Sequence, residues 1–412
     1  MTTPPTGAPR PLPDRPDLKQ LKDQAKDLLR AGAAPTLAQA QFQLAREYGF
    51  ASWPKLKRHV ESLRRSGQLK EAIDAEDFAA VQALMTEDPE LHRAPLGYAK
   101  NGPLTWVAEC RGKPGPSAAR LAMARWMIEH GSDVHQGGDG PLMRAALNDT
   151  RIPMLELLVA HGADVNARWN GTYPILLASC EALAPKALAW LLDHGADVNV
   201  ASPQYGRPLA MLLGTYARNA PGKQACLAAL SAHGVEMPDT PMLALHRGRG
   251  DLLEAHLKRD PGLLARRFSE AEMSPPELGL KPGDGLCVTP VADTTLLHAA
   301  VEFHDAAMTA WLLEHGADPN VRGAVDAVGF GGHTPLYHTV VTLGAHTPDL
   351  AKLLLAHGAD PKLRASVRKA LRDMGDPELE KPREWREVTA QEYARAFHVP
   401  RWVNTPVLAL LE

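Results

Sequence analysis

The chain has 412 residues, too many for one ordinary hydrophobic core, and its 45% apolar and 23% charged residues are typical of a folded protein. A formal net charge of −3 gives no electrostatic case for binding a phosphate backbone, so we expect no nucleic-acid partner. No run of about 18 apolar residues occurs and the proline-rich start contains no signal-type apolar stretch, so we expect a cytoplasmic protein that binds no membrane.

The first elements expected along the chain are a tail and a group of helices. Residues 1–16 are rich in proline, and we expect a disordered tail there. Residues 17–66 have apolar residues at helical spacing and are expected to form a separate helical extension. Its last helix is predicted to start after Ser52, a good capping residue, and to run to Leu63.

One phrase of six residues recurs after this extension. Its first three copies start 31 and 33 residues apart, and a period near 33 is typical of a solenoid. Apolar residues seven, four and three positions before each copy form one helical stripe, and the Gly that follows the His suits the left-handed end of a helix. The His lies where the helix dipole favours a cation. The copies begin at His130, His161, His194, His315 and His357, with a degenerate copy at His233.

A second phrase predicts where the next helix starts. Its fullest copy is Thr-Pro-Leu, in which the hydroxyl caps the helix and the missing N–H of proline costs nothing in the first turn. Each unit is then a short helix, a loop, a longer helix and a turn, and such a unit can bury its apolar stripe only against its neighbours. The copies of the second phrase begin at Gly140, Gly206, Thr295 and His333.

These two phrases, in this order and at this period, resemble the ankyrin repeat family over about residues 68–366. The resemblance implies an all-α ankyrin repeat solenoid of about eight helix-turn-helix repeats with β-turn fingers, and it assigns hydrogen bonding between neighbouring repeats to His298. The segment from Leu44 to Pro54 resembles the helical extension that precedes ankyrin arrays in many bacterial proteins. This second similarity implies a bacterial source.

The array is expected to occupy residues 67–366. Within it, residues 268–294 are rich in Pro and Gly and are predicted to be an irregular insertion. Residues 362–386 are dense in charge and are expected to form a solvated helix and loop. Residues 367–412 are expected to be a diverged capping repeat, whose helix start is predicted at Thr389.

Six residues between a helix end and the next helix start are candidate partner-binding positions. They are expected at finger tips, and exposed aromatic and Arg side chains are enriched in protein interfaces. The alternative, that these side chains pack on neighbouring repeats, stays open. The Trp residues that recur within the repeats (Trp126, Trp190 and Trp311) are interpreted as core packing. The candidates are Arg168, Trp169, Tyr205, Arg207, Asp326 and Phe330.

No pattern in the chain predicts catalysis or a cofactor. The glycine patterns of a nucleophile elbow and of a phosphate-binding loop are absent, as is the His-Glu-x-x-His metal pattern. The helix-ending phrase accounts for six of the 17 histidines, and the four cysteines lack paired spacing. We therefore expect reduced thiols, no bound metal, no cofactor and no enzymatic activity.

The function expected from the sequence is that of a scaffold. A monomeric, non-catalytic array would bind an unidentified protein partner through its fingers and the concave helix face. The alternative is a small-molecule or metal-responsive regulatory module, which would use the 268–294 insertion and the histidines near it, namely His333, His338 and His346.

Overall fold

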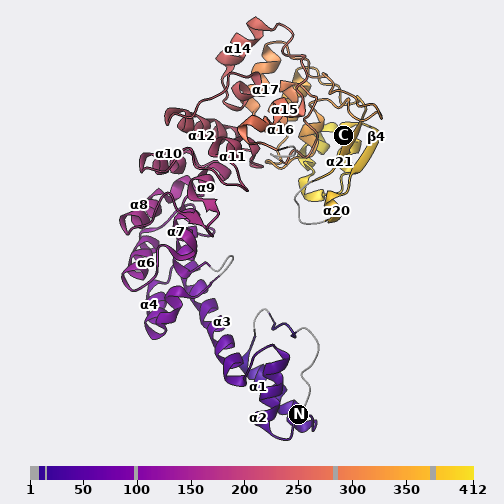
Figure 1. Cartoon of the computed structure of the whole chain (residues 1–412). Coiled ribbons are helices and arrows are strands. Elements are labelled where there is room, and N and C mark those ends of the chain that lie inside the picture. Colours follow the sequence, from indigo (N-terminus) through magenta and orange to yellow (C-terminus); the bar gives the residue numbers. More distant parts are fainter. Residues whose placement is uncertain (1–8, 14–15, 97–100, 282–285, 372–376) are drawn as a thin grey trace. The chain divides into compact units, whose positions relative to one another are not determined.

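The computed structural model describes residues 9–13, 16–96, 101–281, 286–371 and 377–412 (Figure 1). The chain divides into two compact units. The first comprises residues 1–142 and 156–163, and the second comprises residues 143–155 and 164–412. Among the described residues, no helix combines the length and the apolar character needed to cross a membrane.

Six helices of the first unit follow one another along the chain. They are α1 (Leu18–Arg30), α2 (Leu37–Glu47), α3 (Trp53–Asp74), α4 (Phe78–Glu87), α5 (Pro103–Glu109) and α6 (Ala118–Glu129). Two further helices contribute residues to both units, α7 (Gln136–Ala145) and α8 (Ile152–Ala160).

Helix α3 corrects one expectation drawn from the sequence. It does not end at Leu63 but runs to Asp74, a length of 22 residues, across the expected boundary at 66/67. Its first half buries Leu56 and Val60 against α1 and α2, while its last turns bury Leu69 and Ile73 near α4 and α5. Because apolar residues lie at helical spacing on both sides of the boundary, one continuous helix can serve both groups.

The predicted disordered tail lies partly outside the described residues, since residues 1–8 and 14–15 are not among them. The described residues 9–13 contact the N-terminal helices. The Arg10 N–H donates to the Glu47 carbonyl at 2.8 Å, and its guanidinium lies 5.3 Å from the centre of the Tyr48 ring. This part of the expected tail is therefore held by α2.

The second unit contains the remaining helices and all four strands. The helices are α9 (Ile175–Glu181), α10 (Pro185–Asp193), α11 (Pro208–Gly214), α12 (Ala220–Ala232), α13 (Pro241–His246), α14 (Gly250–Arg259), α15 (Glu270–Met273), α16 (Leu296–Glu302), α17 (Ala306–Glu314), α18 (Tyr337–Val340), α19 (Asp349–Ala356), α20 (Pro377–Glu380), α21 (Ala390–Arg395) and α22 (Thr405–Leu411). The strands form two antiparallel pairs, β1 (Arg168–Trp169) with β2 (Tyr173–Pro174) and β3 (Ala365–Lys369) with β4 (Arg383–Val388).

The predicted helix ends are confirmed at all six copies of the phrase. Each helix stops at the residue before the His, and the following Gly has φ between 88° and 114°. The His ring Nδ1 lies 2.7–2.9 Å from the carbonyl oxygen four residues earlier, so the imidazole itself satisfies an orphan carbonyl. The recurring Trp residues stack on these rings, with centroids 3.7–4.3 Å apart, and are only partly buried rather than enclosed in the core: Trp126, Trp190 and Trp311.

The last residue of the phrase joins one repeat to the next. The Asn166 amide donates to the Gly195 carbonyl at 3.0 Å, and its oxygen accepts from the Asp197 N–H at 2.8 Å. Asn320 makes the same pair of bonds to the next copy of the phrase, at 2.8 and 2.7 Å. Consecutive turns are thereby tied in register.

His298 performs the role that the family resemblance implies. Its Nδ1 lies 3.0 Å from the Thr295 hydroxyl, and its Nε2 lies 3.0 Å from the His333 carbonyl in the next repeat. The insertion before this helix is closed at its base, since the Phe268 N–H donates to the Thr294 carbonyl at 2.8 Å. Phe268 is buried, so the insertion is anchored in the core at one end.

The charge-dense segment, of which residues 372–376 lie outside the described residues, contains the short helix α20 but also two strands that were not predicted. Residues 365–369 and 383–388 form the antiparallel strands β3 and β4, which lie beside α21 (Figure 1). Trp385, the buried residue of β4, packs on Tyr393 with ring centroids 5.0 Å apart. The expected boundary at 366/367 falls within β3, whereas the predicted helix start at Thr389 is confirmed by its capping box with Glu392.

Candidate functional site

The first candidate finger is a tight hairpin made by β1 and β2. Trp169 pairs with Tyr173, and Asn170 and Gly171 between them have φ of 50° and 72°. Asn and Gly are the residues that tolerate this left-handed backbone, which matches the right-handed twist of the strands. The local sequence therefore holds Trp169 beside the turn.

The second finger is closed by two backbone hydrogen bonds between Ser202 and Gly206, at 2.9 and 2.8 Å. Two side chains join it to the first finger. The Arg168 guanidinium donates to the Ala201 carbonyl at 3.0 Å, and the Ser202 hydroxyl donates to the Thr172 carbonyl at 3.3 Å. Arg168 thus braces the two fingers against each other.

Three aromatic rings form a row across these two fingers. Tyr173 lies between Trp169 and Tyr205, with ring centroids 6.2 and 4.9 Å away and edge-on geometry at both contacts. Tyr173 is buried and donates to Glu181 at 2.6 Å. Burial, followed by the nearby Glu181 carboxylate, raises the pKa of its phenol, so it stays a neutral donor. Trp169 and Tyr205 are partly exposed on either side.

Arg207 follows Tyr205 and is exposed just before α11. Four of the six predicted positions (Arg168, Trp169, Tyr205 and Arg207) are therefore brought together on two adjoining fingers. The sequence analysis missed Tyr173, the ring that connects the two partly exposed aromatics. The sequence did contain a signal for Tyr173. It is the third residue after Asn170, and in a hairpin that turns at Asn170 this position pairs with Trp169.

Asp326 and Phe330 belong to a different surface. The expectation that Phe330 is exposed is wrong, since only 5% of it is accessible. The guanidinium groups of Arg368 and Arg386 lie 4.7 and 4.1 Å from its ring centre. Asp326 is exposed, yet it accepts from the Phe330 N–H at 2.9 Å and pairs with Arg368 at 2.8 Å.

The strands β3 and β4 therefore cover the finger that carries Phe330. The Gly331 N–H also donates to the Ser366 carbonyl of β3 at 2.6 Å. At the tip of this finger, Val325 and Val328 are 61% and 59% exposed, and these apolar side chains are the residues that sequence reasoning missed here. The Ala-Val-Asp-Ala-Val run around Asp326 was the available signal.

A buried polar cluster lies elsewhere in the second unit. Glu302, at the end of α16, accepts from Arg218 at 2.9 Å and from the Val288 N–H at 3.2 Å, and its other oxygen lies 2.8 Å from His338 Nδ1. Burial acts to raise the pKa of Glu302, but the bonds to His338 and Arg218 outweigh it and the pKa is lowered. The carboxylate is therefore held in its charged form.

Three histidine rings adjoin this cluster. His298, His333 and His338 have centroids 5.4–5.6 Å apart. Burial, with the neighbouring His338, lowers the pKa of His333 to about 3, so this ring is neutral. Within the described part of the chain, no three His, Cys, Asp or Glu side chains are placed to hold a metal ion, and the four cysteines are free thiols.

Comparison with protein families agrees with this geometry. Residues 116–202 match the family model described as ankyrin repeats (3 copies), and residues 293–324 match that of the ankyrin repeat. No curated protein matches the sequence. The matched segments contain four of the six helix-ending histidines (His130, His161, His194 and His315) and the finger that carries Trp169. The chain thus contains ankyrin repeats, modules that in general mediate protein–protein interaction, and its fold is an all-α ankyrin repeat solenoid.

Proposed function

We propose that the chain is a non-catalytic scaffold that binds a partner protein through the fingers of its ankyrin repeats. The observation that carries this proposal is the row of Trp169, Tyr173 and Tyr205 across two adjoining fingers. Its central ring is buried and hydrogen-bonded, so the two outer rings are held in place before a partner arrives. Rigid aromatic side chains lose little entropy on binding, and they dominate interface energetics.

The polar side chains around the row fit this role. Arg207 is exposed beside Tyr205, and Arg168 is committed to the Ala201 carbonyl. We infer that Arg207 contacts the partner directly, whereas Arg168 acts by keeping the fingers parallel. A standard interface needs about 20–30 residues a side, so neighbouring fingers and short helices would complete the contact. The proposed partner is a protein, and the proposed state of the free chain is a monomer in the cytoplasm.

The test compares two variants of the full-length chain. Trp169→Ala with Tyr205→Ala removes both outer rings, and Tyr216→Ala removes a tyrosine that is 56% exposed outside the fingers. Proteins captured from the native host would be identified with the unchanged chain, and the captured partner would then be purified and titrated. We expect the double variant to weaken its binding at least thirtyfold, the loss of about 2 kcal/mol typical of a hot spot.

Tyr216→Ala should leave the affinity unchanged, and circular dichroism should show both variants folded. An affinity of the double variant equal to that of the unchanged chain would refute the finger site. The purified chain could also be tested for hydrolysis or group transfer on a small molecule that copurifies with it. Such an activity, if it is lost when the buried polar cluster around Glu302 is mutated, would refute the non-catalytic role.

A further inference from the structure

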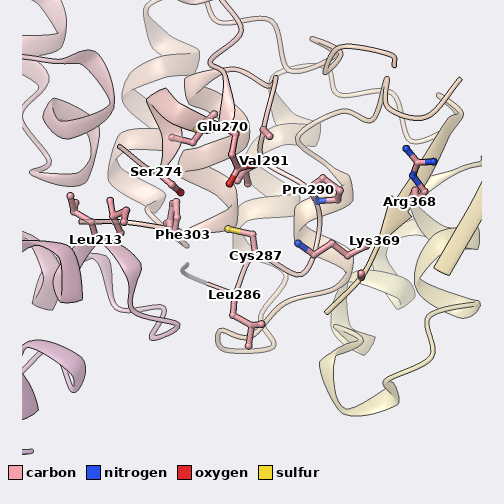
Figure 2. A pocket seen from close by; sticks show the side chains of 14 residues that line it. Leu213, Glu270, Ser274, Leu286, Cys287, Pro290, Val291, Phe303, Arg368 and Lys369 are labelled. Carbon is pink, nitrogen blue, oxygen red and sulfur yellow. The ribbon is translucent and has the colours of Figure 1, made fainter. Parts of the chain in front are cut away.

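The second unit contains a cavity of about 250 Å³ whose walls come from four separate parts of the chain (Figure 2). One wall comes from described residues of the insertion, between 270 and 280 and between 286 and 292. The others are Phe303 at the end of α16 with Leu213 of α11, and the end of β3 at Lys369. The insertion therefore completes a pocket, partly open to solvent, between a repeat and the end of β3.

The walls of this cavity combine apolar and polar side chains. Leu213, Met273, Leu280, Val291 and Phe303 contribute hydrocarbon or aromatic surface. A ligand site of this kind is typically apolar, with a few convergent polar groups that fix the orientation of the ligand. The polar lining residues include Ser274, Glu270, whose carboxylate is exposed, Lys369 and the adjacent Arg368.

Lys369 is placed where its amine could act as the counter-ion of a bound anion. It is partly buried, and Figure 2 shows its amine directed toward Cys287 and Pro290. Among the described residues, no carboxylate lies within ion-pair distance of it. The adjacent Arg368 points the other way and is paired with Asp326 at 2.8 Å. Successive residues of a strand face opposite sides, which explains the difference.

The other cations near the cavity are unsuited to a ligand. Arg218 is fully buried and paired with Glu302, and Lys223 lies with its amine 4.4 Å from the centre of the Phe303 ring and is not part of the lining. A partly buried cation that has no carboxylate partner among the described residues loses part of its hydration, and a ligand carboxylate would offset that cost. Glu270 would repel an anion, so the carboxylate belongs at the Lys369 end.

We propose that this cavity binds a small apolar carboxylate, with Lys369 as its counter-ion. Its size limits the ligand. A dry cavity of about 150 Å³ holds benzene, so 250 Å³ corresponds to about ten non-hydrogen atoms, as in phenylacetate.

Binding at this site involves no covalent step. Burial, and then the nearby Glu302 carboxylate, raises the pKa of the Cys287 thiol to about 12, so the sulfur that faces the cavity stays protonated and is a poor nucleophile.

Calorimetric titration of the purified full-length chain tests the site. The probes are phenylacetate and hexanoate, each compared with its uncharged amide of the same size. We expect each carboxylate to bind at least tenfold more tightly than its amide, because a charge-assisted hydrogen bond contributes about 1.5–3 kcal/mol.

Lys369→Met keeps the length of the side chain and removes its charge. It should weaken carboxylate binding at least tenfold and leave amide binding unchanged, while the matched control Lys352→Met, an exposed lysine of α19, should change neither. Absence of binding by both carboxylates at millimolar concentration overturns the proposal. Equal affinity for carboxylate and amide, or no effect of Lys369→Met, overturns it as well.

Discussion

Arg218 and Glu302 form an ion pair that is almost completely shielded from solvent. Their nearest nitrogen and oxygen atoms are 2.9 Å apart, and the two side chains are 1% and 2% exposed. The two residues are 84 positions apart, so this pair joins the start of α12 to the end of α16. Removal of one charge from such a pair leaves the other buried without compensation.

Glu302→Gln is therefore expected to lower the free energy of unfolding by about 3–5 kcal/mol. Urea denaturation followed by circular dichroism measures this change. Glu314→Gln, which alters an exposed carboxylate on the next helix, should change it by less than about 0.5 kcal/mol. The double change Arg218→Met with Glu302→Leu should be less damaging than Glu302→Gln alone, and the reverse order would contradict the account.

Lys223 is a buried cation whose replacement should stabilise the protein. Its side chain is 3% exposed, and its amine has no hydrogen-bond partner among the described residues. Burial, and then the positive charge of Arg218, lowers its pKa to about 7. In the unfolded chain the pKa is near 10.4, so the free energy of unfolding rises with pH between these values.

Lys223→Met is expected to raise the free energy of unfolding at pH 7 by about 1–3 kcal/mol. This gain should shrink as the pH rises from 7 and vanish above about pH 10.5. Thermal or urea denaturation at pH 7 and at pH 10.5 provides the measurement. A variant less stable than the parent at pH 7 would show that the amine has a favourable partner.

His304 should make the protein less stable in mild acid. Burial is the main reason that its pKa is lowered to about 4; Arg218 and His346 act in the same direction and Glu302 opposes them. Its Nε2 lies 2.5 Å from the Thr342 hydroxyl. In the unfolded chain the pKa of a histidine is near 6.5. Above this pH the ring is neutral in both the folded and the unfolded chain, so it does not change the free energy of unfolding. Stability is then lost as the pH falls toward 4, because the unfolded chain takes up the proton first.

His304→Asn removes the titrating ring, so unfolding of the variant in mild acid should take up one proton fewer than unfolding of the parent. Asn tolerates the positive φ of 57° at this position. Between pH 6.5 and 4.5 the unfolding free energy of the variant should fall less steeply, by about 1.4 kcal/mol per pH unit. Denaturant titrations at four pH values measure the slope. Parallel pH profiles for parent and variant would refute the assignment.

Truncation of Phe330 is expected to cost much more stability than truncation of Val328. Phe330→Ala removes a ring that is 95% shielded and in contact with Arg368 and Arg386, so it should cost about 3–5 kcal/mol of stability. Val328→Ala alters a side chain that is 59% exposed and should cost less than about 0.5 kcal/mol. Urea midpoints compare the two, and equal losses would show that the strands do not cover the finger.

Local chemistry accounts for what could be predicted from the sequence. The helix ends at His130, His194 and His315 depend on a ring nitrogen, a carbonyl four residues earlier and a Gly with positive φ. All of these parts lie within six residues of one another, so the repeated phrase was sufficient to place them. The Asn-Gly turn beside Trp169 is local in the same sense.

Contacts between distant residues accounted for the errors. Phe330 is buried by Arg368 and Arg386, which lie 38 and 56 positions further along the chain. The segment that carries these arginines was expected to be a helix and loop, because a high density of charged residues is typical of a solvated segment. The sequence alone does not show that its backbone pairs as two strands. The continuation of α3 through the expected boundary has the same origin, since its two halves serve different neighbours.

The sequence by itself determined the repeat, the ends of its helices and the position of its fingers, because hydrogen bonds and backbone conformations within one turn specify them. The tertiary structure alone decided which finger is open and which is covered, that the Tyr173 ring lies between those of Trp169 and Tyr205, and that Lys369 lines a cavity with no carboxylate of the described residues within ion-pair distance. Those features depend on packing against residues that are more than about thirty positions away in the sequence. The spacing of residues along the chain does not show which of these distant residues come into contact.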